Sequence, residues 1–305
     1  MSDAVQVILS WYESDNPGVK PNLARMLYHG RLGGTGKLII LPVDQGFEHG
    51  PDRSFAPNPP AYAPHYHFQL AVDAGLSAFA SPLGMLEAGA STFAGRLPLI
   101  LKVNSANLLF PKSGPKTQAV TSTVHDALRL GCTAVGLTIY PGSLASYDML
   151  EVAREFVGEA KEVGLPTVIW SYPRGEDISK DGETAIDVDA YATQIAALLG
   201  AHIIKVKLPT AFVEAKDIAE LYKKGNVKLD TLADRVAHIR KAALGGRRIV
   251  IFSGGGKKGD AEIFEEARAI KAGGGQGSII GRNAFQRSKA DAMALLDKLI
   301  EIYKS

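Results

Sequence analysis

The chain has 305 residues, of which 46% are apolar and 22% charged, and its formal net charge is +2 at pH 7. This balance is typical of a globular protein and does not indicate nucleic acid or an anionic membrane as a partner. A single cysteine, Cys132, excludes an internal disulfide, and we expect a cytoplasmic protein. No apolar run reaches the ~18 residues that a membrane span requires, and the N-terminus shows no signal-peptide pattern.

Short apolar, β-rich runs recur along the chain, and most are followed by a helical pattern. Their continuous apolar character is typical of parallel strands that are covered on both faces. The predicted strands span 37–44, 77–82, 97–104, 133–140, 166–173, 202–209, 247–255 and 277–283. Several predicted helices end at glycine, a common residue just beyond a helix C-terminus. The clearest helices span 146–164, 187–200, 231–246 and 260–274.

Eight β/α repeats in a chain of this length predict a (β/α)₈ barrel, the TIM barrel, in a single domain over residues 1–305. A doubly wound sheet is the alternative, but it usually has fewer strands and a glycine-rich first turn, whereas this first turn is VDQGFEHGP. Residues 1–36 are expected to form an N-terminal extension of one or two helices. The proline-rich segment 45–65 is expected to be a long structureless loop, of the kind that forms lids or binding loops.

The predicted strand AHIIKVKLP carries two lysines, Lys205 and Lys207, in a run that otherwise favours burial. Side chains alternate along a strand, so both lysines point into the barrel while Ile204, Val206 and Leu208 point out to the helices. One interpretation is that both lysines pair with carboxylates and seal the core. The other is that a neighbouring cation and partial desolvation lower the pKa of one lysine, whose amine then attacks a carbonyl to form a Schiff base.

Aldol cleavage through a Schiff base also needs proton carriers at the barrel mouth, where the strands end. Tyr172 and Asp44 occupy such positions and are the candidate acid and base. Trp170 shares a strand face with Tyr172, with core packing as its alternative role. Lys102 and Arg174 would add positive charge at the same mouth.

Glycine-rich turns follow the last two predicted strands, at SGGGKKGD (253–260) and GRNAFQR (281–287). The corresponding loops are the usual phosphate site of TIM barrels. Glycines expose backbone N–H groups there, and a helix N-terminus follows each turn. We therefore predict a phosphate site that comprises Ser253, Gly254, Gly255, Gly281 and Arg282.

A metal ion is the alternative electrophile for aldol cleavage, and metal-dependent aldolases hold Zn²⁺ with several histidines. Of the seven histidines in the chain, three are placed to gather near the barrel mouth. These three are His49, His65 and His67, all in or beside the segment 45–65. His-x-His at 65–67 is a possible ligand pair, but with all three histidines in one segment we expect no metal site.

Four motifs together resemble the archaeal-type class I fructose-bisphosphate aldolase family, including its bacterial members. They are LPVDQGFEHGP (41–51), WSYPRG (170–175), IIKVK (203–207) with SGGG (253–256), and GRNAFQR (281–287). The first and third motifs also suit the wider group of Schiff-base barrel aldolases, whereas WSYPRG is more specific. In order, the four motifs cover the chain from about residue 36 to about residue 290.

The resemblance implies that Lys205 is the Schiff-base lysine and Lys207 a neighbouring cation, a choice that spacing alone leaves open. It places the acid/base tyrosine at Tyr172, its aromatic neighbour at Trp170 and the aspartate of the first strand at Asp44. The two glycine-rich turns fall on the phosphate loops of the family.

The implied reaction is the reversible cleavage of fructose 1,6-bisphosphate to dihydroxyacetone phosphate and glyceraldehyde 3-phosphate. This is a lyase activity (EC 4.1.2.13) of glycolysis and gluconeogenesis, and it uses no cofactor. Family members assemble into homo-oligomers, so the resemblance implies several subunits.

Two features depart from the family pattern and bear on the far end of the substrate. KVKLPT lacks the KxxYTGD continuation of archaeal members, and the segment 45–65 is long. Related Schiff-base aldolases, transaldolases or thiolases that act on another phosphorylated ketose or dione are therefore alternatives. A metal-dependent aldolase and a phosphosugar isomerase are the alternatives from other classes. Glu48 and His49 lie beside Asp44, where contacts to sugar hydroxyls are expected.

Overall fold

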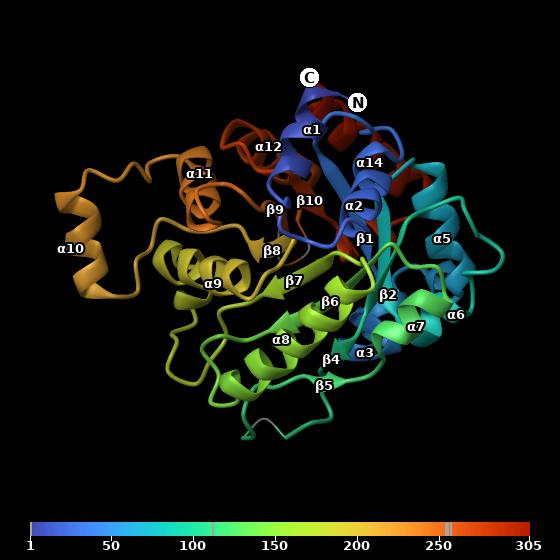
Figure 1. Cartoon of the computed structure of the whole chain (residues 1–305), viewed down its shortest axis with the longest axis horizontal. Coiled ribbons are helices and arrows are strands. Elements are labelled where there is room, and N and C mark those ends of the chain that lie inside the picture. The colour runs from blue at the N-terminus through green and yellow to red at the C-terminus, as the bar shows by residue number, and fades with distance from the viewer. Residues whose placement is uncertain (1, 112, 254–255, 257) are drawn as a thin grey trace.

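Eight parallel strands form a closed barrel in the computed structural model, which describes residues 2–111, 113–253, 256 and 258–305 (Figure 1). The strands are β1 (Leu38–Pro42), β2 (Ala78–Pro82), β3 (Leu99–Lys102), β6 (Ala134–Ile139), β7 (Thr167–Ser171), β8 (Ile203–Lys207), β9 (Ile249–Ser253) and β10 (Gly277–Ile279). Each lies within one of the eight predicted strands, so the (β/α)₈ prediction is confirmed.

The order of the strands around the barrel is β1-β10-β9-β8-β7-β6-β3-β2. The register aligns Trp170 on β7 with Lys205 on β8, and Lys207 on β8 with Ser253 on β9. Parallel strands in register end at the same edge, so candidate residues from three neighbouring strands meet at the carboxyl end of the barrel.

The strand residues divide into an inner and an outer apolar cluster, as alternation requires. On β8, Ile203 belongs to the inner cluster, whereas Ile204 and Val206 belong to the outer cluster between barrel and helices. The Lys205 residue is only 4% exposed. The predicted inward direction of this lysine is therefore confirmed.

Helices cover the outside of the barrel, and those predicted from the sequence are present. They are α5 (Pro64–Asp73), α6 (Leu83–Glu87), α7 (Val124–Arg129), α8 (Ser146–Glu162), α9 (Ile186–Leu198), α11 (Leu232–Ala242), α12 (Asp260–Ala272), α13 (Arg282–Phe285) and α14 (Lys289–Lys304). Capping boxes start two of them: Thr123 with Asp126 in α7, and Thr231 with Asp234 in α11. No helix in the described ranges is both long and apolar enough to cross a membrane.

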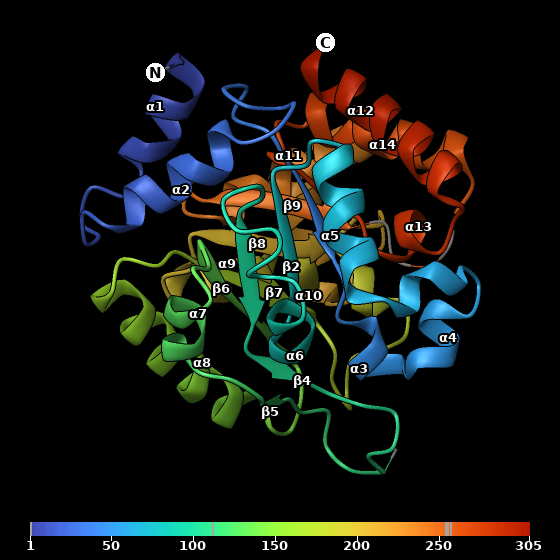
Figure 2. The same cartoon turned by 90° about the vertical axis from the view of Figure 1, so that its right-hand side faces the viewer.

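The N-terminal extension forms two helices, α1 (Asp3–Ser10) and α2 (Val19–Tyr28), at the end of the barrel opposite β4, β5 and α3 (Figure 2). Tyr12 fixes this extension to the barrel floor. Its hydroxyl donates to the carbonyl of His202 (2.5 Å) and accepts from the N–H of Ile249 (3.2 Å). This packing supports the proposal that residues 1–305 form one domain.

The segment 45–65 is helical, so the expectation of a structureless loop is wrong. It contains α3 (Gln45–His49), α4 (Pro51–Phe55) and the 3₁₀ helix η1 (Pro59–Tyr62), and α5 begins at Pro64. Pro51, Pro59 and Pro64 each occupy the first turn of a helix. Proline is favoured there because its fixed φ suits the helix and its missing N–H would have no helical partner.

Two further elements were not predicted. A hairpin of β4 (Asn104–Ser105) and β5 (Ala119–Val120) follows β3. Helix α10 (Lys216–Lys224) lies in the connection after β8 and projects away from the barrel (Figure 1). This connection is the one in which KVKLPT departs from the family pattern, and α10 lies within it.

Candidate active site

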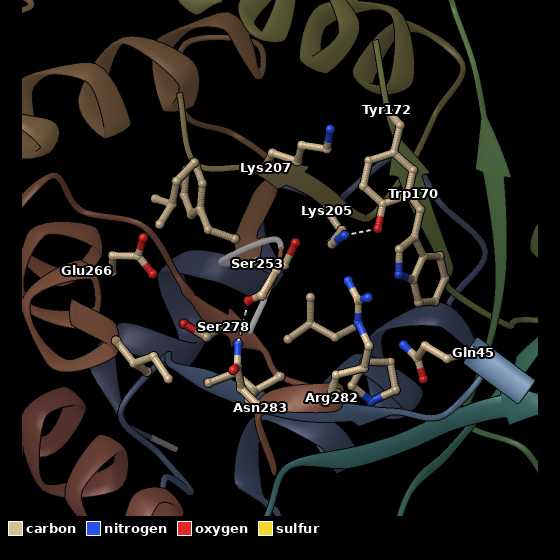
Figure 3. Close-up of a pocket in the computed structure, with 18 of the residues that line it drawn as sticks. Gln45, Trp170, Tyr172, Lys205, Lys207, Ser253, Glu266, Ser278, Arg282 and Asn283 are labelled. Atoms are coloured by element: carbon tan, nitrogen blue, oxygen red, sulfur yellow. Dashed lines mark hydrogen bonds between the residues drawn. The ribbon is translucent and has the colours of Figure 1, made fainter. Parts of the chain in front are cut away.

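A cavity of about 290 Å³ opens at the carboxyl end of the barrel (Figure 3). Most of the predicted site residues line it: Asp44, Trp170, Tyr172, Arg174, Lys205, Lys207, Ser253, Gly281 and Arg282. Lys102 is not in the lining, and it is buried. The predicted residues Gly254 and Gly255 lie outside the described residues. Asn283 of the motif GRNAFQR also lines the cavity, as do Gln45 and Glu183, which the sequence did not indicate.

Lys205 lies at the centre of this site and contacts Tyr172. Its amine donates a hydrogen bond to the Tyr172 hydroxyl and lies 3.9 Å from the centre of the tyrosine ring (Figure 3). Burial lowers the pKa of Lys205 to about 7, with further lowering by Lys207 and Lys102, against the carboxylates of Asp44 and Glu48. A substantial fraction of the amine is therefore neutral, as a nucleophile requires.

Lys207 differs from Lys205 in having a close carboxylate. Its Nζ lies 2.9 Å from Oε2 of Glu183, which belongs to the 3₁₀ helix η2 (Gly182–Thr184). The described residues give Lys205 no carboxylate at ion-pair distance. Each of the two interpretations therefore holds for one lysine. Lys207 pairs with a carboxylate, whereas Lys205 has a lowered pKa, as a Schiff-base lysine requires.

Lys102 lies behind the cavity wall, next to Asp44 and Trp170. Its Nζ is 3.8 Å from Oδ2 of Asp44, 5.7 Å from the centre of the Trp170 ring, and donates to the carbonyl of Asn104 (2.6 Å). Lys102 was expected to add positive charge at the mouth and to help bind the substrate, and its buried position suits the electrostatic role better than a direct contact. Trp170 is almost fully buried, so it both packs in the barrel and forms part of the cavity wall.

The turns after β9 and β10 meet at one side of the cavity. Asn283 joins them, because its Oδ1 accepts from the N–H of Lys258 (3.1 Å) and its Nδ2 donates to the carbonyl of Gly256 (3.1 Å). A Cβ at Gly281 would lie 2.8 Å from the carbonyl oxygen of Pro42, so a side chain does not fit there. Asn283 thus ties Gly256 and Lys258 to the turn after β10, while the binding of a phosphate by backbone N–H groups and Arg282 stays a prediction.

Glu48 and His49, on α3, line the cavity beside Asp44. Burial and then the charge of Asp44 raise the pKa of Glu48 to about 7, although Lys102, Arg174 and Lys205 act in the opposite direction. Burial also lowers the pKa of His49. Because α3 begins directly after Asp44, the short helix turns both side chains toward the substrate space.

The three histidines considered for a metal do not gather. The ring of His65 bonds to the carbonyl of Ala88 (2.8 Å), and the buried ring of His67 bonds to that of Ala61 (2.7 Å). Both lie on α5, where residues two apart do not face each other. The described residues contain no group of three or more His, Cys, Asp or Glu side chains suited to a metal ion.

A family model for DeoC/LacD family aldolases matches residues 38–287, which include every strand of the barrel. The chain belongs to the DeoC/LacD family of aldolases. The match runs through all four motifs that carried the resemblance to class I aldolases.

Curated relatives of this DeoC/LacD aldolase match most of its length. A probable class 1 fructose-bisphosphate aldolase of Chlamydia muridarum is 38% identical over 309 residues, covering 95% of this chain and 86% of that protein. A class 1 fructose-bisphosphate aldolase of Thermoproteus tenax is 35% identical over 268 residues, covering 88% and 89%.

Solved structures of archaeal enzymes have the same fold as this DeoC/LacD aldolase. An archaeal fructose 1,6-bisphosphate aldolase superimposes with a TM-score of 0.77 at 32% identity, covering 93% of this chain and 99% of that one. Another, with its catalytic lysine covalently bound to the carbinolamine intermediate of the substrate, has a TM-score of 0.77 at 31% identity and the same coverage.

Proposed function

We propose that the protein is a class I aldolase that reversibly cleaves fructose 1,6-bisphosphate to dihydroxyacetone phosphate and glyceraldehyde 3-phosphate through a Schiff base on Lys205. The observation that carries this proposal is the buried amine of Lys205. It has a pKa lowered to about 7 and contacts the hydroxyl of Tyr172 in a cavity beside the glycine turns. The named function of the curated relatives supports the same substrate.

The reaction starts when the neutral amine of Lys205 adds to the C2 carbonyl and forms a carbinolamine. Loss of the C2 hydroxyl as water needs a proton, and the Tyr172 hydroxyl is placed to give it because it contacts Nζ. The C3–C4 bond then breaks, and its electron pair moves to the iminium nitrogen to give an enamine. The proton of the C4 hydroxyl leaves to a base, for which Asp44 is the candidate.

Dihydroxyacetone phosphate leaves after the enamine takes a proton at C3 and water hydrolyses the iminium. No step needs a metal ion or an organic cofactor, since the iminium itself accepts the electrons. The turns that contain Ser253, Gly281 and Arg282 bind a phosphate. Assembly into a homo-oligomer, which the resemblance to the family supports, and a cytoplasmic location, which the single cysteine supports, complete the proposal.

The activity is tested by incubating the purified protein with fructose 1,6-bisphosphate and measuring both triose phosphates, with and without EDTA. We expect cleavage at the same rate in both samples. Loss of activity with EDTA would instead favour a metal-dependent aldolase. Interconversion of sugar monophosphates without cleavage would favour the isomerase.

The pH dependence of Schiff-base formation is expected to follow the pKa of Lys205, about 7. Below that pH the amine is protonated and cannot attack, so adduct formation with dihydroxyacetone phosphate should fall about tenfold per pH unit. Above it, the rate should level off. The measurement is the initial rate of borohydride-trapped adduct between pH 5 and 9.

Glu48 titrates in the same range, so Glu48→Gln is the control for this profile. The Glu48 carboxylate raises the pKa of Lys205, and its removal should therefore keep the acid limb but move it to lower pH. A rate that continues to rise toward pH 10, as for an ordinary lysine, would contradict the assignment.

A further inference from the structure

Arg174, three residues beyond the end of β7, lines the cavity on the side away from the turns after β9 and β10. The barrel order β9-β8-β7 places Lys205 between the Ser253 side and the Arg174 side. Two strand spacings separate these sides by roughly 10 Å. That separation suits a six-carbon ketose with a phosphate at each end, whose carbonyl lies between the two anions.

The charge of Arg174 is not neutralised by a protein carboxylate. In the part of the chain that the structure describes, no Asp or Glu lies at ion-pair distance from it. Lys207 and Lys180, on the same side of the cavity, both pair with Glu183, at 2.9 and 3.2 Å. Both lysines are thus held by a carboxylate, whereas the charge of Arg174 is left available to an anionic ligand.

Two aromatic rings, rather than a carboxylate, fix the position of the Arg174 guanidinium. Its Cζ lies 5.4 Å from the centre of the Tyr140 ring and 5.1 Å from the centre of the Tyr172 ring. Nη1 also donates a long hydrogen bond of 3.4 Å to the Tyr140 hydroxyl. Both contacts orient the charge without cancelling it.

A hydrogen bond from the β4–β5 hairpin fixes the position of Tyr140. The Nε2 of Gln118, the residue before β5, donates to the Tyr140 hydroxyl at 2.6 Å, and Tyr140 is only 4% exposed. Asn104 of β4 ties the hairpin to β6, since its side chain donates to the carbonyl of Thr138 (2.8 Å) and accepts from its N–H (2.7 Å). The hairpin thus delivers Gln118 to a fixed position.

The backbone around Arg174 is equally constrained. Its N–H donates to the carbonyl of Tyr172 (2.7 Å), and Gly175 pairs with Gly142 in a parallel bridge. A Cβ at Gly175 would lie 1.8 Å from the carbonyl oxygen of Gly142, so only glycine permits this approach. The segments after β6 and β7 are therefore held together on both sides of Tyr140 and Arg174.

We propose that Gln118 and Tyr140 form a brace that positions Arg174 to bind the second phosphate of the substrate, so that bisphosphates are preferred over monophosphates. This inference rests on the proposed aldolase function and adds a specificity determinant to it. Gln118 and Tyr140 are positioning residues, because they act through Arg174. On this proposal Arg174 binds the phosphate on C6, and the turns after β9 and β10 bind the phosphate on C1 that dihydroxyacetone phosphate retains.

The test compares fructose 1,6-bisphosphate with fructose 1-phosphate, which lacks the C6 phosphate. Tyr140→Phe keeps the ring but loses the hydroxyl, and we expect its KM for the bisphosphate to rise about tenfold. Its KM for the monophosphate and its kcat for both substrates should stay close to those of the wild type. Arg174→Met should raise the KM for the bisphosphate further and remove the preference.

Three readouts separate this brace from a general structural role. Tyr147→Phe, at a tyrosine that is 80% exposed, is the matched control and should change nothing. Borohydride trapping with dihydroxyacetone phosphate, which carries no C6 phosphate, should give the wild-type yield in Tyr140→Phe. Gln118→Leu should act as Tyr140→Phe does, more weakly.

Other outcomes overturn the inference. A KM that rises equally for both substrates, a lower kcat at unchanged KM, or a lower trapping yield would show that Tyr140 does not act through a C6-phosphate contact. Should Tyr140→Phe fail to fold, Arg174→Met decides by the same comparison. If the wild-type protein cleaves neither substrate, the aldolase proposal and this inference both fail. If the wild type is active and only the variants depart from expectation, this inference alone fails.

Discussion

Borohydride reduction of the protein in the presence of dihydroxyacetone phosphate is expected to leave one covalent adduct, on Lys205. The amine is almost fully buried, contacts the Tyr172 hydroxyl and has a pKa lowered to about 7, so it can add to the ketone near neutral pH. Peptide mapping by mass spectrometry locates the adduct. Lys205→Met should form none and should lower kcat/KM on the order of 10⁴-fold or more, because the covalent route is lost.

Lys207→Met is the matched control, since it removes a lysine two residues away on the same strand face. It should retain the adduct on Lys205, because Lys207 is paired with Glu183 and is not needed as a nucleophile. It should bind the substrate more weakly, because the Glu183 carboxylate left without Lys207 would repel an anionic substrate. An adduct on Lys207 in the wild type would keep the mechanism but overturn the assignment. No adduct with either lysine intact would rule out the Schiff base.

The β8 strand shows how far the sequence predicts the site. Alternation along a strand is a local rule, and it correctly placed Lys205 inside the barrel and Ile204 and Val206 outside it. The partner of Lys207 was not predictable in this way. Glu183 lies in a polar segment 24 residues earlier, and no periodicity links the two positions.

Two of the unpredicted elements are very short, unlike helix α10 with its 9 residues. The strands β4 and β5 have two residues each, too few for an alternating pattern, yet their hairpin carries Gln118 to Tyr140. In the segment 45–65, the density of prolines predicts a loop, whereas in the structure prolines begin helical turns. Proline is compatible with both structures, and the choice depends on packing against the rest of the barrel.

The predicted lowering of the pKa of Lys205 agrees with the structure, but its causes are partly different from the predicted ones. The sequence suggested a neighbouring cation with partial desolvation, whereas burial is the largest cause in the structure and Lys207 and Lys102 are smaller ones. Two carboxylates, Asp44 and Glu48, oppose the shift. Their effect depends on distances across the barrel mouth, which alternation along one strand does not give.

Tyr172→Phe is expected to lower kcat by roughly 10² to 10⁴-fold, the usual contribution of a general acid or base, with a much smaller change in KM. The hydroxyl that contacts Nζ of Lys205 would be lost, but the ring that lies 5.1 Å from the Arg174 guanidinium would remain. Steady-state kinetics with fructose 1,6-bisphosphate measure both constants. The rate of borohydride-trapped adduct formation should fall with kcat, since water cannot leave the carbinolamine without a proton.

Tyr140→Phe and Tyr172→Phe remove hydroxyls from two tyrosines whose rings both lie next to Arg174. Their expected effects differ in kind, because only the Tyr172 hydroxyl reaches Lys205. The first change should raise KM for the bisphosphate and spare the chemistry, and the second should slow the chemistry and largely spare KM. If Tyr172→Phe kept wild-type kcat, the proton for carbinolamine dehydration would have to come from another group, and Glu48, whose pKa is raised to about 7 in the same cavity, would be the first to test.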